Sequence, residues 1–159
     1  MNPDKIDMNW NQHFIYNPDG TLTRLHSNNQ HTTVGWVNSE GYMQLEHAGK
    51  NYMLHRVIWE WHYGALPKGY QIDHRDRNPL NNLIENLRPC TQLQNKQNQG
   101  IQKNNTLGYR GVIRTPNGKY QARLGHKGVK LYLGLFDTAE QASACIEQKR
   151  VELHGEFAA

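Results

Sequence analysis

Short apolar stretches separated by turn residues fill the first fifty positions of the chain. One pair of stretches flanks the turn signal Asn-Pro-Asp-Gly at residues 17–20, and a second pair flanks Asn-Ser-Glu-Gly at residues 38–41. Apolar and polar residues that alternate on both sides of such turns are typical of antiparallel hairpins. We therefore expect a small antiparallel sheet with strands at residues 13–16, 21–25, 34–37 and 42–46.

The pattern then changes from the period of a strand to the period of a helix. Apolar residues recur at intervals of three and four positions, which places them on one face of a helix; they are Leu54, Val57, Ile58 and Trp61. Gly64 follows as a C-terminal stop. This face is interpreted as part of the core.

Beyond the helix the chain predicts a strand, a long loop, a second strand and a short helix. Residues 70–74 form the first strand, and residues 75–82 form an irregular loop rich in Asn. The chain returns as a strand at residues 87–90. Thr91 is a suitable N-cap for a helix that runs to about Asn98.

The C-terminal third predicts a three-stranded meander followed by a helix. Residues 100–107 have no periodicity and are expected to be a linker. The helix begins at Thr138, and its expected inward residues are Ala142, Cys145, Ile146 and Leu153. The expected strands lie within residues 109–114, 120–124 and 129–133. The fold class is thus α+β, with one domain at residues 1–99 and another at 108–159.

Composition limits the environment of the protein. The mean hydropathy is −0.87, and no apolar stretch reaches the roughly 18 residues that span a bilayer. The N-terminus lacks the basic and apolar regions of a signal peptide. Cys90 and Cys145 are the two cysteines, far apart in sequence and without a Cys-x-x-Cys pair. We expect no disulfide framework, no membrane partner and a cytoplasmic location, with no secretion.

The net charge of +4 conceals a strong asymmetry along the chain. Residues 75–130 hold eleven Lys and Arg against two acids, Asp76 and Glu85, whereas residues 1–50 and 131–159 are acidic on balance. A basic middle with few acids indicates a polyanion as partner. A solvated basic face is the alternative.

The basic segment begins directly after Asp73 and His74. An imidazole that deprotonates water, with a carboxylate and an amide oxygen for a hard cation, is sufficient to hydrolyse a phosphodiester. Each residue also has a plain structural interpretation. The Asp-His pair is commonly a turn or capping device, Asn82 and Asn86 are common turn residues, and Asn95 is a solvated helix residue.

At these positions the chain resembles the HNH endonucleases of phages and mobile introns, which belong to the ββα-metal, or His-Me finger, nucleases. The resemblance rests on Leu54-His55-Arg56, on residues 72–78, and on residues 80–88. It covers about residues 13–98, with the ββα-metal core at about 54–98. Asp-His, an Asn twelve residues after the His and an Asn nine further on form the pattern of this subgroup.

The resemblance implies a role for each matched residue. His74 is the general base, Asp73 and Asn95 bind one Mg²⁺ or Mn²⁺ per active site, and Asn86 braces the loop. An Asn as the last letter of the motif implies a hard cation and not zinc. His55 either contacts phosphate or packs beside the site.

The segment from about 108 to 157 resembles the AP2 DNA-binding domain, in which one sheet face lies in the major groove and a helix packs behind. Tyr109-Arg110-Gly111-Val112 is one of its motifs, and residues 118–122, 133–136, 138–142 and 153–155 carry the others in order. Ile113, Asn117 and the pair Lys149-Arg150 depart from the pattern. The resemblance and the basic setting together imply these contacts to double-stranded DNA: Arg75, Arg77, Arg88, Lys96, Arg110, Arg114, Thr115, Lys119, Arg123, Lys130 and Tyr132.

The sequence thus predicts a divalent-metal-dependent DNA endonuclease of homing or phage type that nicks one strand. The alternatives are a non-catalytic DNA-binding regulator with a vestigial nuclease fold, and a nuclease with little sequence preference. The sequence leaves open whether the protein is a monomer or a homodimer.

Overall fold

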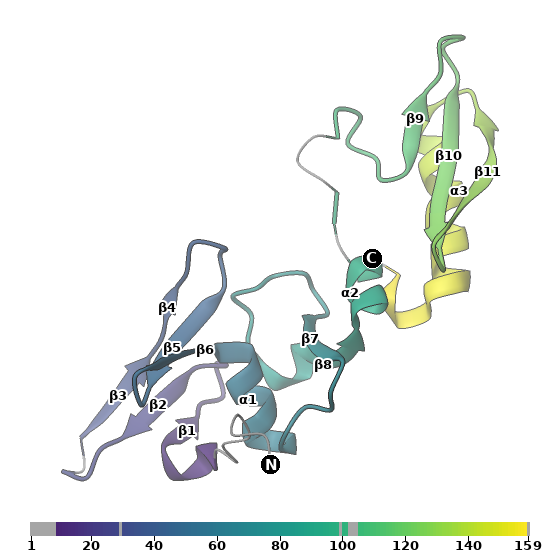
Figure 1. Cartoon of the computed structure of the whole chain (residues 1–159). Coiled ribbons are helices and arrows are strands. Elements are labelled where there is room, and N and C mark those ends of the chain that lie inside the picture. The colour runs from purple at the N-terminus through teal and green to yellow at the C-terminus, as the bar shows by residue number, and fades with distance from the viewer. Residues whose placement is uncertain (1–8, 29, 99, 102–104, 159) are drawn as a thin grey trace. The chain divides into compact units, whose positions relative to one another are not determined.

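A computed structural model describes residues 9–28, 30–98, 100–101 and 105–158. The chain divides into two compact units, Met1–Thr91 and Gln92–Ala159, and each has its own hydrophobic core. Figure 1 shows the elements of both units. The predicted domains at 1–99 and 108–159, with a linker at 100–107, stay a prediction. The first predicted domain ends at residue 99, after the helix at residues 92–98. The first compact unit ends at Thr91, before that helix.

The first unit contains two small three-stranded antiparallel sheets where we predicted one sheet. Gly35, with φ of +119°, interrupts the predicted strand at residues 34–37 and separates the two sheets. The last strand of the second sheet was not predicted. The strands are β1 (Phe14–Tyr16), β2 (Leu22–Leu25) and β3 (His31–Val34), then β4 (Trp36–Val37), β5 (Met43–His47) and β6 (Lys50–Met53).

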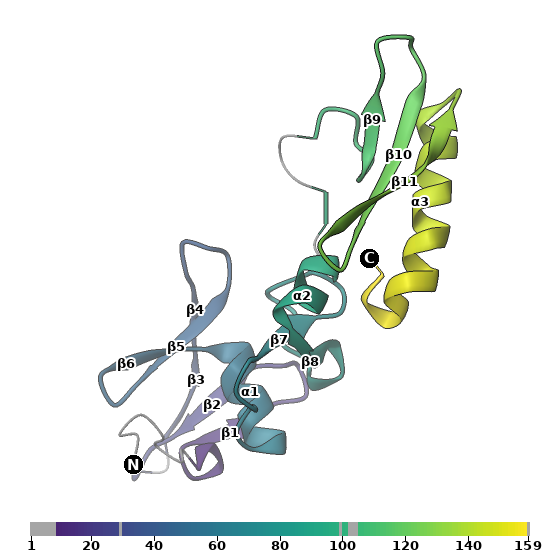
Figure 2. The ribbon, with the colours of Figure 1, turned by 45° about the vertical axis from the view of Figure 1, so that its right-hand side comes forward.

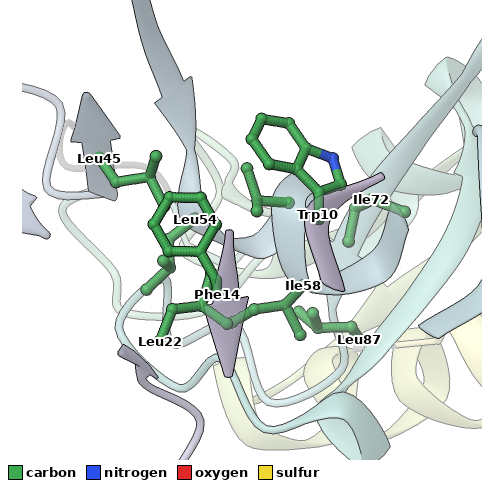
Figure 3. Close-up of a cluster of buried hydrophobic side chains, with 9 residues drawn as sticks. Trp10, Phe14, Leu22, Leu45, Leu54, Ile58, Ile72 and Leu87 are labelled. Atoms are coloured by element: carbon green, nitrogen blue, oxygen red, sulfur yellow. The ribbon is translucent and has the colours of Figure 1, made fainter. Parts of the chain in front are cut away.

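The helix α1 (Leu54–Tyr63) forms as predicted and ends at Gly64, whose φ is +77°. Leu54, Val57 and Ile58 are buried, and Trp61 packs against them from the edge of the core. The indole of Trp61 donates to the backbone oxygen of Phe14 at 3.0 Å, which joins α1 to β1. Figure 3 shows the buried side chains of this core.

A two-stranded antiparallel ribbon carries the candidate site. It consists of β7 (Tyr70–His74) and β8 (Leu87–Thr91), and the register pairs Asp73 with Arg88 and His74 with Leu87. Both strands confirm the prediction. The loop between them ends in a 3₁₀ turn, η2 (Ile84–Asn86). A second 3₁₀ turn, η1 (Trp10–Gln12), precedes β1.

The second unit begins with α2 (Gln92–Asn98) and continues into the predicted meander and helix. The strand order is β11-β10-β9, and α3 lies along one face of this sheet in both views (Figure 2). The predicted linker at residues 100–107 lies partly outside the described residues. The remaining elements are β9 (Val112–Arg114), β10 (Tyr120–His126), β11 (Val129–Phe136), α3 (Ala139–His154) and η3 (Gly155–Phe157).

The start of α3 confirms the prediction in atomic detail. Thr138 is the N-cap, and its hydroxyl accepts from the backbone N–H of Gln141 at 3.2 Å, while the Gln141 side chain accepts from the N–H of Thr138. This reciprocal pair is a capping box. Ala142 and Ile146 are buried against the sheet.

Period-two alternation gives the sheet one face for the helix and one outer face. Val112, Ala122 and Leu124 are buried beneath α3. The sheet-plus-helix arrangement is therefore confirmed, whereas its assignment as an AP2-like module stays a prediction.

Both cysteines are free thiols. Burial raises the pKa of Cys90 to about 11, so this thiol stays protonated at neutral pH. In the described part of the chain, no helix is both long and apolar enough to cross a membrane.

Candidate active site

His74 ends β7 and is buried, with 6% of its surface exposed. Its Nε2 lies 3.2 Å from Oδ1 of Asn82, which is also buried. The Asn82 amide nitrogen donates to the backbone oxygen of Leu80 at 3.2 Å, so the amide oxygen must be the atom that faces the ring. An amide oxygen only accepts hydrogen bonds. Nε2 is therefore the donor in this contact.

Asp73 precedes His74 and is buried to a similar extent, at 5% exposed. Its Oδ2 accepts from Nε of Arg88 at 2.8 Å and pairs with a terminal guanidinium nitrogen of Arg88 at 2.8 Å. The cross-strand register brings these two residues together. Arg88, predicted as a DNA contact, is thus enclosed in a buried ion pair, with its side chain only 4% exposed.

The loop after His74 is held by Asp76 and Asn86. The Asn86 amide nitrogen donates to Oδ1 of Asp76 at 2.9 Å and to the backbone oxygen of Asn81 at 2.8 Å. Its amide oxygen accepts from the backbone N–H of Asp76 at 3.1 Å. Partial burial raises the pKa of Asp76, but hydrogen bonds from Asn78, Asn81 and Asn86 outweigh it and hold this pKa below its usual value. Asn86 thus joins the loop to the start of the returning strand β8.

His55, on the first turn of α1, lies beside His74. Their ring centroids are 5.1 Å apart in an edge-on arrangement, and the ring of Tyr42 lies 5.8 Å from His55 and 6.1 Å from His74. Burial, followed by the nearby charges of His74 and Arg56, lowers the pKa of His55 to about 4. At neutral pH the ring that flanks His74 is therefore uncharged.

The hairpin β1–β2 contacts the loop between β7 and β8. The hydroxyl of Tyr16 accepts from the backbone N–H of Ile84 at 3.1 Å. Gly20, in the turn of this hairpin, has φ of +81°, and a Cβ built there would lie 2.8 Å from the backbone of Asn82 and of Leu83. The residue that bonds His74 is thus held between its own loop and the N-terminal hairpin.

The comparisons with known proteins agree on one family. A family model described as HNH endonuclease matches residues 52–97, which include His74, Asn86 and Asn95. Protein 3.8 of Escherichia phage T7 is 36% identical over 105 residues, which is 65% of this chain and 86% of that protein. The chain belongs to the HNH endonuclease family.

Two further relatives carry the HNH name themselves. The HNH endonuclease L560 of Acanthamoeba polyphaga mimivirus is 33% identical over 125 residues, covering 78% of this chain and 64% of that protein. A putative HNH homing endonuclease derived from the SPbeta prophage of Bacillus subtilis is 34% identical over 55 residues, covering 35% of this chain and 32% of that protein. A solved structure of DNA binding and cleavage by the HNH homing endonuclease I-HmuI matches with a TM-score of 0.47 and 27% identity, covering 60% of this chain and 56% of that one.

In this HNH chain the predicted metal ligands are an Asp and an Asn. Asp73 lies on β7, and Asn95 lies on α2 with its side chain partly buried. Carboxylate and amide oxygens are ligands that Mg²⁺ takes, and Mg²⁺ needs only one or two of them from a protein. Among the described residues, His, Cys, Asp and Glu form no cluster of three or more. Asp73 belongs to the first unit and Asn95 to the second, so their pairing as cation ligands stays a prediction.

The predicted DNA contacts of the second unit fall into two groups. Arg123 on β10 lies opposite Tyr132 on β11, and alternation places Lys130 on the same outer face. Alternation along β9 places Arg114 on the same side of the strand as the buried Val112, although Arg114 itself is exposed. Lys119 forms an exposed ion pair with Asp137 at 3.0 Å, and the Thr115 hydroxyl donates to the backbone oxygen of Lys119 at 2.9 Å.

The remaining predicted contacts border the loop and α2. Arg75 and Arg77 are exposed, and Arg77 adopts a left-handed φ of +62°. Lys96 is exposed on α2. Arg110 donates to the backbone oxygens of Gln97 and Lys96 at 3.0 and 3.1 Å, so it joins α2 to the segment before β9.

Sequence reasoning assigned no role to Asn82 beyond a turn and none to the pairing of Arg88 with Asp73. Nothing in the residue types singles out Asn82 among the neighbouring asparagines. The Arg88 pairing follows from the register of β7 and β8, which a twelve-residue separation leaves undetermined in sequence.

Proposed function

We propose that this protein is a divalent-cation-dependent DNA endonuclease in which His74 is the general base. The observation that carries the proposal is the orientation of the His74 ring. The contact of Nε2 with Asn82 holds the ring at the end of β7, where His74 would take a proton from water.

In the proposed reaction, His74 removes a proton from a water molecule, and the hydroxide attacks phosphorus. The bond from phosphorus to the 3′ oxygen breaks, which leaves a 5′ phosphate and a 3′ oxygen that takes up a proton. Asn82 keeps the ring in place, and Asn86 keeps the loop in place. Neutral His55 encloses the ring without adding a charge beside the proton that His74 accepts.

The cation would be Mg²⁺ or Mn²⁺, held by Asp73 and Asn95. When bound, it would supply positive charge for the phosphate and for the leaving oxygen. A carboxylate has about four acceptor positions, so the ion pair of Asp73 with Arg88 through Oδ2 is compatible with this second role. Arg88 orients the carboxylate in this proposal, in place of the DNA contact that we expected.

Binding is assigned to the basic surfaces. The outer face of the second unit combines Arg123 and Lys130 with Tyr132, as in the AP2-like interpretation, and Arg75 and Arg77 border the catalytic loop. Phosphate contacts of this kind position a protein on DNA. Because each chain has one His74, we expect a nick in one DNA strand. The proposed location of this reaction is the cytoplasm.

The test is relaxation of supercoiled plasmid by the full chain and by His74→Ala, each with Mg²⁺ and with EDTA. Nicking by the wild type with Mg²⁺, lost with EDTA and in His74→Ala, supports the proposal. Equal relaxation in all samples, or in none, contradicts it. A non-catalytic regulator with a decayed site is less favoured, because Asp73, His74, Asn86 and Asn95 are all present.

A further inference from the structure

The second unit contains a basic cavity of about 320 Å³ that the proposed reaction does not use. It lies where α2, the segment before β9, the β10–β11 turn and the end of α3 meet. Figure 2 shows α2 near the β10–β11 turn and the end of α3. No Asp or Glu is among the described residues that line it, and its Lys and Arg residues are Lys96, Arg110, Arg123, Lys127 and Arg150.

Two of these cations have structural partners. Arg110 donates to backbone oxygens of α2, and Arg150, which is 3% exposed, donates to both oxygens of Glu147 at 3.0 and 3.2 Å. Within the described part of the chain, Lys96, Arg123 and Lys127 have no side-chain hydrogen bond or ion pair. The cavity therefore holds positive charges that the protein itself does not neutralise.

Two histidines line the same cavity, His126 from the end of β10 and His154 from the end of α3. Their ring centroids are 5.3 Å apart. The Nδ1 atom of each is buried and has no hydrogen-bond partner among the described residues, and His154 is only 8% exposed. Burial, and then the charges of His126, Arg150 and Arg110, lower the pKa of His154.

Buried polar atoms in folded proteins almost always have a partner. Two imidazole nitrogens without one, beside a lining that contains cations and no acids, favour a ligand that is an anion and accepts hydrogen bonds. Phosphate meets both requirements, because its oxygens accept charge-assisted bonds from Arg and Lys. The volume lies at the small end of the range for ligand pockets, which suits a phosphate group with part of its sugar.

We propose that this cavity binds one phosphate group of a DNA strand. The inference rests on the proposed DNA-directed function, and it adds a discrete phosphate site to the outer face of the sheet. Arg123 belongs to both surfaces, so a strand that crosses the outer face would place a phosphate at the mouth of the cavity. Both an internal phosphodiester and a terminal 5′ phosphate have the required chemistry.

The test follows the imidazole resonances of His126 and His154 by NMR in the full chain, in EDTA so that DNA is not cut. Inorganic phosphate is the first probe. We expect both resonances to shift together and to saturate. Lys127→Gln and Lys96→Gln should each weaken binding roughly three- to tenfold, as expected for loss of one charge-assisted bond. Lys149→Gln removes the same charge from exposed α3 outside the cavity and should bind like the wild type.

The second probe is a short single strand with either a 5′ phosphate or a 5′ hydroxyl, and the third is a short duplex. If Lys127→Gln weakens only the 5′-phosphorylated strand, the site takes a terminal phosphate. If it weakens all three and lowers the slope of log affinity against log salt by about one on the duplex, the site takes an internal phosphate.

Resonances that do not move with phosphate overturn the cavity proposal, as does an equal loss of affinity in Lys149→Gln and Lys127→Gln. Plasmid nicking is measured separately on the same preparations. Nicking without a response of the histidines contradicts the cavity alone, whereas a response without nicking contradicts the proposed nuclease activity alone.

Discussion

Asn82 accepts a hydrogen bond from His74 through an amide whose orientation is set by a second bond, to the backbone oxygen of Leu80. The pair is buried, with Asn82 3% exposed. A side chain that is eight residues away in sequence thus holds the ring of His74 in its orientation. This relationship leads to the first prediction.

Asn82→Ala should lower the rate of plasmid nicking by about tenfold or more, because the ring loses the bond that positions its basic nitrogen. It should also reduce the free energy of unfolding by about 1–3 kcal/mol, since the His74 N–H is left buried without that acceptor. Single-turnover nicking and urea denaturation measure the two effects.

Asn82→Asp, which keeps an acceptor oxygen, should retain more activity than Asn82→Ala. Asn51→Ala, on exposed β6, is the control and should change neither quantity. Wild-type nicking by Asn82→Ala would contradict the role of Asn82.

The ion pair between Asp73 and Arg88 leads to a second prediction. Removal of one partner leaves the other charge buried, which costs about 3–5 kcal/mol in comparable pairs. We expect Arg88→Met to lower the free energy of unfolding by this amount, and the double variant Asp73→Asn/Arg88→Met to recover part of it. The double variant should nevertheless fail to nick DNA, because the negatively charged carboxylate that is proposed to hold the cation is gone.

Urea denaturation of Arg56→Met is the matched control for Arg88→Met. Arg56 pairs with Glu60 at 3.1 Å on the exposed face of α1, and exposed pairs of this kind contribute about 0.3–0.5 kcal/mol. Equal effects of the two Arg→Met substitutions would show that burial of the Asp73–Arg88 pair is not important for stability. Nicking by a stable double variant would remove Asp73 from the proposed mechanism.

The local elements could be predicted from sequence, because each is specified by residues close to it. The apolar face of α1 ends at Gly64, and Thr138 with Gln141 starts α3. The partners of the site residues could not be predicted, because they depend on strand register and on loop conformation. The same limit applies at Gly35. The alternation of apolar and polar residues predicted one sheet, whereas the positive φ of Gly35 interrupts the strand and separates two sheets.

Gly20 illustrates how a distant turn determines the geometry of the site, and it leads to a third prediction. Gly20→Ala should destabilise the protein and also reduce nicking, because a Cβ at this position would push the backbone of Asn82 and Leu83. Gly41→Ala is the control, since Gly41 has φ of +85° and its Cβ would have no neighbour within 4 Å.

Both substitutions carry the backbone strain of a non-glycine residue in the left-handed region, about 1–2 kcal/mol. Only Gly20→Ala adds the contact with the catalytic loop. The measurements are urea denaturation and the nicking rate under conditions where both variants are folded. Equal nicking rates for Gly20→Ala and Gly41→Ala would show that the hairpin turn does not act on His74 through Asn82.

The fourth prediction concerns His55 and acid. Its pKa is about 4 in the folded protein, whereas an unfolded His has a pKa of about 6.5. Between these values the unfolded chain binds a proton that the folded chain does not, so stability is complete above about pH 6.5 and falls as the pH drops towards 4. At pH 5 the loss of unfolding free energy attributable to His55 is on the order of 2 kcal/mol.

His55→Leu should therefore show a smaller loss of unfolding free energy between pH 7 and pH 5 than the wild type. NMR should place the midpoint of the titration of the His55 resonance at about pH 4. A midpoint near 6.5 would mean that a charged ring lies beside His74 in mild acid, and that His55 does not provide the neutral surroundings that the proposed proton transfer requires.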